Sequence, residues 1–276
     1  MNTQLNTMGP EWFEWIKHNI QRGCTHESII DTLQKTWSRV ESLNAFNDVL
    51  NSLSKVDFKR PLIDTATNFV QLPDCRPQIL FTLSNPYIVL IDNVLSISEC
   101  DAIVLLAKQK GLNGSTVVDY DSGASVVHDA RTSSGTSFER SENQFITALE
   151  TRLSTLSNWP LEKAEPIQVL QYRDGQQYKP HHDYFDVTKP GSASHLIRGG
   201  QRVGTFVVYL TDVEQGGSTI FPNLGVEVRP RKGAAVFFSD VDEQGKPNPE
   251  TLHGGAPVIT GTKIVATYWQ RERQFV

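Results

Sequence analysis

Apolar side chains recur every three or four residues near the start of the chain, which is the spacing of one face of a helix. The pattern begins after Pro10, a residue suited to a first helical turn, and is interrupted at Gly23. Its apolar positions are Trp12, Trp15, Ile16 and Ile20. Thr25 is placed to cap a second helix, and residues 43–53 fit a third. The sequence therefore predicts a helical N-terminal region.

Residues 54–77 carry three prolines and little periodicity, so we expect a linker there. From residue 78 onward the apolar residues form short runs bounded by Gly, Pro and Asp, which is typical of strands. The runs are 78–84, 87–95, 168–172, 202–211, 226–228, 234–238 and 262–269. One helix is expected at 102–108, with Ser98 as its cap.

Many short strands beside a single early helix favour a β-sandwich or barrel over alternating βαβ units. The expected architecture is mainly β with flanking helices. We predict two domains: a helical region with its linker over residues 1–77, and a β domain over residues 78–276.

Composition narrows the choice of partners. A formal net charge of −5 and the absence of any lysine/arginine run argue against nucleic acid or an anionic membrane as the main partner. Three separated cysteines give neither a disulfide framework nor a thiolate zinc site. Without a signal-peptide pattern or a long apolar run, we expect a cytoplasmic protein. The aromatic residues of the first helix need burial, which favours either packing within the chain or a homodimer.

Candidate metal ligands occur in the segment that contains His181, His182 and Asp183. If this segment is extended, His181 and Asp183 project from one face and His182 from the other. His253, 70 residues after Asp183, lies in a second strand-like stretch and can supply a third ligand. Two histidines and one carboxylate form a facial triad that leaves positions open on iron(II). Each histidine taken singly could equally be a hydrogen-bonded structural residue.

Lys263 adds a second chemical signal. It stands ten residues after His253, at the start of an otherwise apolar strand. A lysine that points into a barrel is costly unless an anion pairs with it. A dicarboxylate that chelates the metal at one end would supply that anion at the other.

Four linked segments resemble the prolyl 4-hydroxylase family of 2-oxoglutarate/iron(II) oxygenases. They are RTSSGTSF at 131–138, YRDGQQYKPHHDYF at 172–185, GGQRVGTFVVYLTDVEQGGSTIFP at 199–222 and HGGAPVITGTKIVATYW at 253–269. The resemblance implies a double-stranded β-helix (jelly-roll) core around a metal pocket. It also implies iron(II), 2-oxoglutarate and O2 as cofactor and co-substrates, with L-ascorbate as an optional reductant.

The resemblance implies roles for individual residues. His181, Asp183 and His253 are similar to the iron ligands, and Lys263 to the residue that pairs with the distal carboxylate of 2-oxoglutarate. Tyr172 and Thr219 resemble hydroxyl donors to that carboxylate. The residues that resemble those around the substrate mouth are Arg131, Ser133, Tyr178, Arg202 and Trp269.

The implied reaction is hydroxylation of an unactivated C–H bond with release of succinate and CO2. Its substrate is a prolyl ring in a peptide, or a free cyclic amino acid such as proline or pipecolate. A peptide would need an open groove, with segments 117–136 and 187–200 as covering loops. A free amino acid would need a cation for its carboxylate, such as Arg131 or Arg202.

Two other classes stay open at the level of sequence. A different metal-dependent enzyme on a cupin-like barrel would give Lys263 no role. A non-catalytic peptide-binding module would tolerate loss of a metal ligand, and all three candidate ligands are present.

Overall fold

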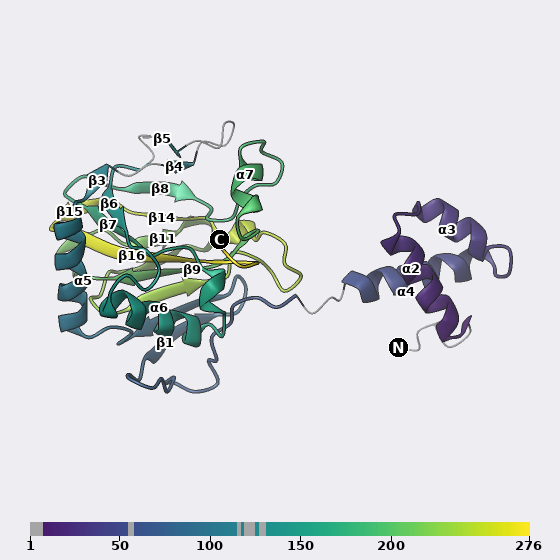
Figure 1. Cartoon of the computed structure of the whole chain (residues 1–276), viewed down its shortest axis with the longest axis horizontal. Coiled ribbons are helices and arrows are strands. Elements are labelled where there is room, and N and C mark those ends of the chain that lie inside the picture. The colour runs from purple at the N-terminus through teal and green to yellow at the C-terminus, as the bar shows by residue number, and fades with distance from the viewer. Residues whose placement is uncertain (1–7, 55–57, 115–116, 119–124, 127–130) are drawn as a thin grey trace. The chain divides into compact units, whose positions relative to one another are not determined.

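A computed structural model describes residues 8–54, 58–114, 117–118, 125–126 and 131–276. The chain divides into two compact units, Met1–Phe58 and Lys59–Val276 (Figure 1). Among the described residues, no helix combines the length and the apolar character that a bilayer span requires.

The described part of the N-terminal unit contains three helices, as predicted. They are α2 (Pro10–Gln21), α3 (His26–Leu33) and α4 (Arg39–Ser54). Thr25 Oγ1 accepts a hydrogen bond from the Ser28 backbone N–H and caps α3 as expected. The third helix begins at Arg39, earlier than predicted, because the Glu41 carboxylate accepts from the Ser38 backbone N–H at 2.9 Å.

The aromatic residues of the first helix pack inside this unit. The Trp12 ring lies 4.6 Å from the Trp37 ring and 5.5 Å from the Trp15 ring, both edge to face. They rest on a buried cluster that includes Ile16, Ile29, Leu33, Phe46 and Val49. The unit's own core therefore accounts for the aromatic density of this helix.

The boundary between the units lies at residues 58 and 59, whereas the sequence placed it at 77. Ile63 and Leu72 are buried in the large core of the second unit. The backbone N–H of Val70 donates to the Pro77 carbonyl, and that of Leu72 to the Cys75 carbonyl. The prolines interrupt the hydrophobic periodicity of this segment, but its apolar side chains are still buried in the core. Most of the expected linker is therefore part of the β domain.

Two antiparallel sheets form the second unit. The larger has the order β1-β2-β13-β9-β16-β7-β6-β3, and the smaller β12-β11-β14-β8. The larger sheet contains β1 (Gln78–Leu83), β2 (Ile88–Asp92), β13 (Ala235–Phe238), β9 (Arg202–Tyr209), β16 (Lys263–Arg271), β7 (Gln168–Tyr172), β6 (Ser134–Ser137) and β3 (Asn113–Gly114). The smaller contains β12 (Val226–Val228), β11 (Thr219–Phe221), β14 (His253–Gly255) and β8 (Tyr178–His181). This arrangement confirms the predicted jelly-roll core.

The remaining elements are short or lie outside the sheets. Two-stranded ladders pair β10 (Gln215–Gly216) with β15 (Val258–Thr260) and β4 (Val117–Val118) with β5 (Ser125–Val126). The helices are α5 (Ile97–Lys110), α6 (Gln144–Leu156), α7 (Ser192–Ile197), η1 (Leu161–Lys163), η2 (Pro222–Leu224) and η3 (Pro249–Thr251).

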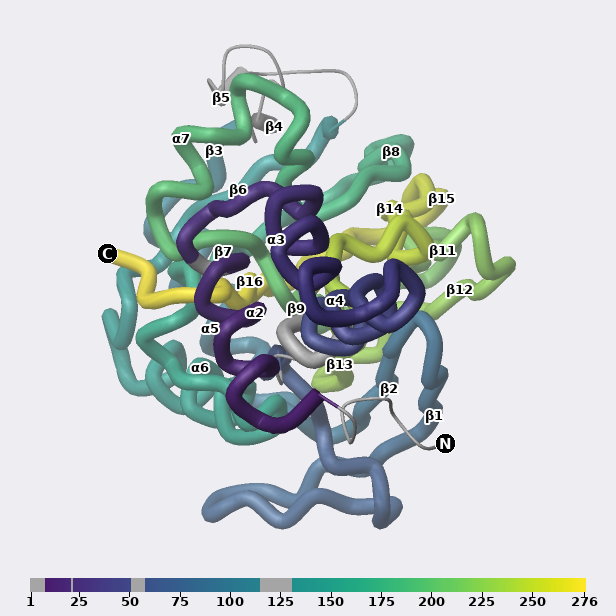
Figure 2. Tube along the Cα trace, turned by 90° about the vertical axis from the view of Figure 1, so that its right-hand side faces the viewer, coloured from purple at the N-terminus to yellow at the C-terminus, as the bar shows by residue number. Residues whose placement is uncertain are grey.

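Alternation along β9 shows how the layers are built. Val207 and Tyr209 face the core between the two sheets, whereas Phe206 and Val208 face the core that includes residues of α5 and α6. In Figures 1 and 2, β8, β14 and β11 lie on one side of the large sheet and α6 on the other. A strand buried on both faces loses its polar alternation, which explains the continuous apolar run at this position.

Helices α6 and α5 of the second unit also differ from prediction. Helix α6 was not predicted, although Ile146, Leu149 and Leu153 lie on one buried face and Asn143 caps its start. Helix α5 begins at Ile97 and is capped by Ser96, not by Ser98. Ser96 and Glu99 have the spacing of a capping box, in which each side chain bonds the other residue's backbone N–H.

Phe237→Ala should lower the free energy of unfolding by about 3–5 kcal/mol, because it removes a fully buried ring from the large core. Phe81→Ala, at a side chain 40% exposed on edge strand β1, should cost about 1 kcal/mol or less. Urea denaturation of both variants measures the difference, and equal losses would contradict this account of the core.

Candidate active site

Strand register brings the two candidate histidine ligands together. Strands β8 and β14 pair antiparallel, with His181 directly opposite His253, and the ring centroids lie 4.4 Å apart. Asp183 follows two residues after His181. His182 turns to other partners, since its Nε2 lies 3.0 Å from the Pro249 carbonyl and its ring stacks on Tyr184. The predicted division of this segment into two faces is therefore present.

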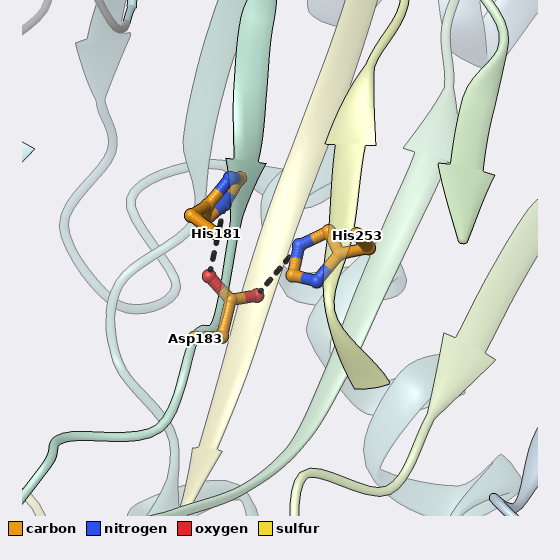
Figure 3. A group of neighbouring side chains, drawn as sticks. All are labelled: His181, Asp183 and His253. Carbon is orange, nitrogen blue, oxygen red and sulfur yellow. Dashed lines mark ion pairs between the residues drawn. The ribbon is translucent and has the colours of Figure 1, made fainter. Parts of the chain in front are cut away.

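The three side chains converge on one point (Figure 3). Asp183 Oδ1 lies 3.6 Å from His181 Nε2, and Asp183 Oδ2 lies 3.5 Å from His253 Nε2. One donor atom from each residue lies within 4.8 Å of the others. These separations suit donors that surround a single cation.

Backbone carbonyls orient both imidazoles. His181 Nδ1 lies 2.9 Å from the Lys179 carbonyl, and His253 Nδ1 lies 3.0 Å from the Thr251 carbonyl. A carbonyl only accepts, so each Nδ1 carries a proton, and in the neutral imidazole Nε2 keeps a lone pair. Two lone pairs and a carboxylate that face one another repel unless a proton or a cation lies between them. The donor set therefore fits a divalent metal with open positions, including iron(II).

Burial keeps the ligands in their binding forms. Burial lowers the pKa of His253 to about 4, so its imidazole is neutral at neutral pH. Burial opposes ionisation of Asp183, but the neighbouring His253, His181 and Arg202 hold the pKa of this carboxyl below its ordinary value. A neutral imidazole and an ionised carboxylate are the forms that bind metal.

All three triad residues line one cavity. Its lining includes Arg131, Leu170, Tyr172, Tyr178, Val207, Thr219, Lys263, Val265, Thr267 and Trp269. Lys263 is 4% exposed and has no hydrogen bond or ion pair with any residue that the structure describes. Burial lowers the pKa of its ammonium group to about 8. An anion in the cavity would relieve this cost.

Hydroxyl groups surround the same end of the cavity. Tyr172 pairs with Lys263 across strands β7 and β16, and its ring centroid lies 5.7 Å from Lys263 Nζ. Thr219 Oγ1 accepts a hydrogen bond of 2.8 Å from the Tyr209 hydroxyl, which leaves the Thr219 proton for a ligand. Tyr209 was not predicted, since its position in a buried strand is typical of a core aromatic.

Four of the five residues predicted at the substrate mouth lie together. Arg131, Tyr178 and Trp269 line the cavity. The Arg131 guanidinium lies 5.0 Å from the Tyr178 ring centroid and donates from Nε to Ser133 Oγ at 3.2 Å. The Tyr178 ring stacks on His181 with centroids 3.6 Å apart.

Arg202 has different partners from those expected of a substrate-binding residue. It does not line the cavity, and Nε and Nη2 donate to the two Glu165 carboxylate oxygens at 2.6 and 2.9 Å. Its guanidinium carbon lies 4.2 Å from the Trp269 ring centroid. Arg202 is thus paired with Glu165 and packed against Trp269, and its Nη1 also lies 3.9 Å from Asp183 Oδ1.

Two further polar residues next to the triad were missed. Thr205 Oγ1 lies 2.9 Å from Asp183 Oδ2 and 2.9 Å from Asp240 Oδ2. Burial, with the charge of Asp183 as the next cause, raises the pKa of Asp240 well above its ordinary value. Asp240 lies just beyond strand β13, and its position in the sequence gave no sign of this contact.

Of the two segments expected as covering loops, 187–200 contains helix α7. In segment 117–136, residues 119–124 and 127–130 lie outside the described residues.

Comparison with known proteins identifies the family. The family model of the 2OG-Fe(II) oxygenase superfamily matches residues 167–271. Prolyl 4-hydroxylase 1 of Arabidopsis thaliana is 37% identical over 232 residues, which cover 79% of each chain. This chain belongs to the prolyl 4-hydroxylase family. Prolyl 4-hydroxylase 2 of the same plant is also 37% identical, over 207 residues that cover 67% of each chain.

A solved structure of the same family agrees. A viral collagen prolyl hydroxylase from Paramecium bursaria Chlorella virus-1, crystallised with 2-oxoglutarate, superposes with a TM-score of 0.54 at 32% identity. The match covers 68% of this chain and 97% of the viral chain. The protein is thus an iron(II)- and 2-oxoglutarate-dependent dioxygenase that uses O2, and the alternatives of an unrelated barrel enzyme or a non-catalytic module are set aside.

His253→Ala should weaken metal binding by more than about 100-fold, beyond the 10- to 100-fold loss typical of second-layer residues. His182→Ala is the matched control, because that imidazole faces Pro249 and Tyr184, and it should bind metal as the unmodified protein does. Anaerobic calorimetry with Mn(II) measures both. A loss in the control as large as that in His253→Ala would contradict the assignment of faces.

Proposed function

We propose that this dioxygenase hydroxylates prolyl residues within a peptide or protein. In this proposal His181, Asp183 and His253 hold the iron, and Lys263 pairs with the distal carboxylate of 2-oxoglutarate. Tyr172 and Thr219 add hydroxyl donors to that carboxylate. Arg131, Tyr178 and Trp269 contact the substrate at the mouth, with Ser133 orienting Arg131.

The environment of Lys263 is the observation that supports the proposed binding of iron and 2-oxoglutarate in one cavity. A buried ammonium group with no described partner stands in the same cavity as a convergent His/Asp/His set. A metal site alone would not require a buried cation, and a cation site alone would not require the triad. A ligand that chelates a metal at one end and presents a carboxylate at the other satisfies both.

With iron(II) bound, 2-oxoglutarate and O2 supply the chemistry, in which the keto acid gives succinate and CO2 while one oxygen atom enters a C–H bond. The chain's own residues position the reactants. Lys263 and the hydroxyl groups fix the direction of the co-substrate, which limits how it can rotate in the cavity. Leu170, Val207 and Val265 line the cavity with apolar surface that excludes water.

One of the two arginines considered for the carboxylate of a free amino acid is unavailable, which favours a prolyl residue in a chain. A free amino acid brings its own carboxylate, which needs a buried cation in addition to Lys263. Of the two arginines considered for that role, Arg202 is neutralised by Glu165 and lies outside the lining. Arg131 lines the cavity and makes a hydrogen bond to Gln168 Oε1 at 3.0 Å. A peptide prolyl ring needs no such counter-ion.

Affinity for 2-oxoglutarate should fall as the pH rises through about 8. In the empty cavity the pKa of Lys263 is lowered to about 8, and a bound carboxylate favours its charged form. Binding above that pH must take up a proton, so the loss approaches about tenfold per pH unit. Below the lowered pKa the lysine is already charged and affinity should be flat.

Calorimetric titration of the Mn(II)-loaded protein with 2-oxoglutarate, between about pH 7 and pH 9.5, measures this slope. Lys263→Arg is the matched control, because guanidinium stays protonated over the whole range. An equal slope in that variant would remove Lys263 as the cause.

Prolyl peptides should gain one oxygen atom in the presence of iron(II) and 2-oxoglutarate, whereas free proline and pipecolate should not. Mass spectrometry of each incubated substrate gives the answer, with reactions lacking 2-oxoglutarate and the His253→Ala variant as blanks. Oxygenation of a free amino acid with no reaction on any peptide would overturn the substrate class but leave the reaction class intact.

A further inference from the structure

Thr205 lies between the buried carboxyl groups of Asp183 and Asp240. The proposed reaction gives Asp240 no role. Thr205 Oγ1 is 2.9 Å from Oδ2 of Asp183 and 2.9 Å from Oδ2 of Asp240. All three side chains are buried, and Thr205 and Asp240 are fully so. A threonine hydroxyl has one proton and can form a well-aligned hydrogen bond with only one of these oxygens.

The second short contact therefore needs another proton. If both carboxyl groups were ionised, one oxygen pair at 2.9 Å would have no hydrogen between its atoms and would repel. The contact becomes favourable when one carboxyl is protonated and donates to Thr205 Oγ1. Asp183 faces both histidine Nε2 atoms and must remain an acceptor, so the extra proton belongs on Asp240.

The charges around Asp240 support the same assignment. The charged groups that act on it are Asp183, Arg202 and Glu165. Arg202 is committed to Glu165, and Arg271 also pairs with Glu165 at 2.7 Å. In the metal-free site, Arg202 and Arg271 already balance the charges of Glu165 and Asp183. No described cation forms an ion pair with Asp240, and its Oδ1 accepts no hydrogen bond from a described residue. A buried carboxyl in this setting is more stable neutral.

We propose that Asp240 is a neutral carboxylic acid that, through Thr205, holds Oδ2 of Asp183 and leaves Oδ1 of Asp183 for the metal. The inference rests on the proposed role of Asp183 as an iron ligand. The Asp240 carboxylic acid donates to Thr205 Oγ1, and the Thr205 hydroxyl donates to Asp183. Because the ionised Asp183 carboxylate can only accept, it fixes the direction of both hydrogen bonds.

The relay has a consequence for coordination. A carboxylate bound through both oxygens would take two positions on the metal, whereas one bound through Oδ1 alone takes one. The hydrogen bond from Thr205 to Oδ2 would favour binding through Oδ1 alone, which would leave three positions open for the co-substrate and O2. Asp240 is thus a positioning residue that acts on the ligand geometry. The loop holds it in place, because its backbone N–H donates to the Val203 carbonyl and its carbonyl accepts from the Asn248 N–H.

Infrared spectroscopy of the metal-free protein at neutral pH tests the protonation state directly. The difference spectrum between the unmodified protein and Asp240→Asn should contain the carbonyl band of one protonated carboxylic acid. A difference band of an ionised carboxylate in its place would overturn the proposal. This readout needs no metal and does not depend on the proposed function.

Metal affinity tests the relay, with variants that keep or remove each donor. Asp240→Asn keeps a donor to Thr205, and Thr205→Ser keeps the hydroxyl, so both should bind Mn(II) within about threefold of the unmodified protein. Asp240→Leu and Thr205→Val remove the donors and should lose about 10- to 100-fold. Val has nearly the shape of Thr, so Thr205→Val remains informative if Asp240→Leu does not fold, with circular dichroism and thermal melting as the check.

The outcomes separate this inference from the proposed function. If the unmodified protein binds no metal, the assignment of the triad fails while the infrared result still decides the state of Asp240. If Asp240→Asn loses as much affinity as Asp240→Leu, Asp240 acts as an anion and the relay is wrong. Loss in the donor-free variants, with retention in Asp240→Asn and Thr205→Ser, supports the relay.

Discussion

The register of β8 against β14 is the constraint on which the active site depends. Antiparallel pairing places His181 opposite His253, although 72 positions separate them in the chain. Because side chains alternate between the faces of a strand, a slip of one residue would turn one imidazole away from the other. The Nδ1 contacts to the carbonyls of Lys179 and Thr251 then hold each ring at the correct angle. Backbone geometry thus sets both the position and the tautomer of the ligands.

Burial without a matching charge is the second physical theme of the site. Lys263 and Asp240 are both buried without an ion pair among the described residues, and the pKa of each group shifts toward its neutral form. The consequences differ because their surroundings differ. Lys263 faces an open cavity, where an incoming carboxylate can restore its charge. Asp240 faces Thr205 inside the protein, where the neutral acid becomes a permanent donor.

Through its resemblance to the family, the sequence alone predicted the reaction class and most of the residues that line the cavity. His181, Asp183 and Lys263 could be predicted because each carries a local signal: two ligands on one face of a short segment, and a charge in an apolar strand. Continuous apolar runs located β2, β9, β13 and β16, which are buried on both faces. Helix α6 was not predicted because polar residues interrupt its apolar positions. The 54–77 segment was predicted as a linker because its prolines interrupt the periodicity that would have indicated burial.

Only the tertiary structure decided which polar side chains meet. Arg202 and Glu165 lie 37 residues apart, and Thr205 and Asp240 lie 35 apart, so no local pattern links either pair. Their contacts follow from how strands and loops pack. A hydrogen bond forms only when the distance between donor and acceptor is correct to within a few tenths of an ångström. Hydrophobic periodicity determines which face of a strand is buried. It cannot determine the partner that a buried polar group finds there, and those partners set the proton positions around the metal ligands.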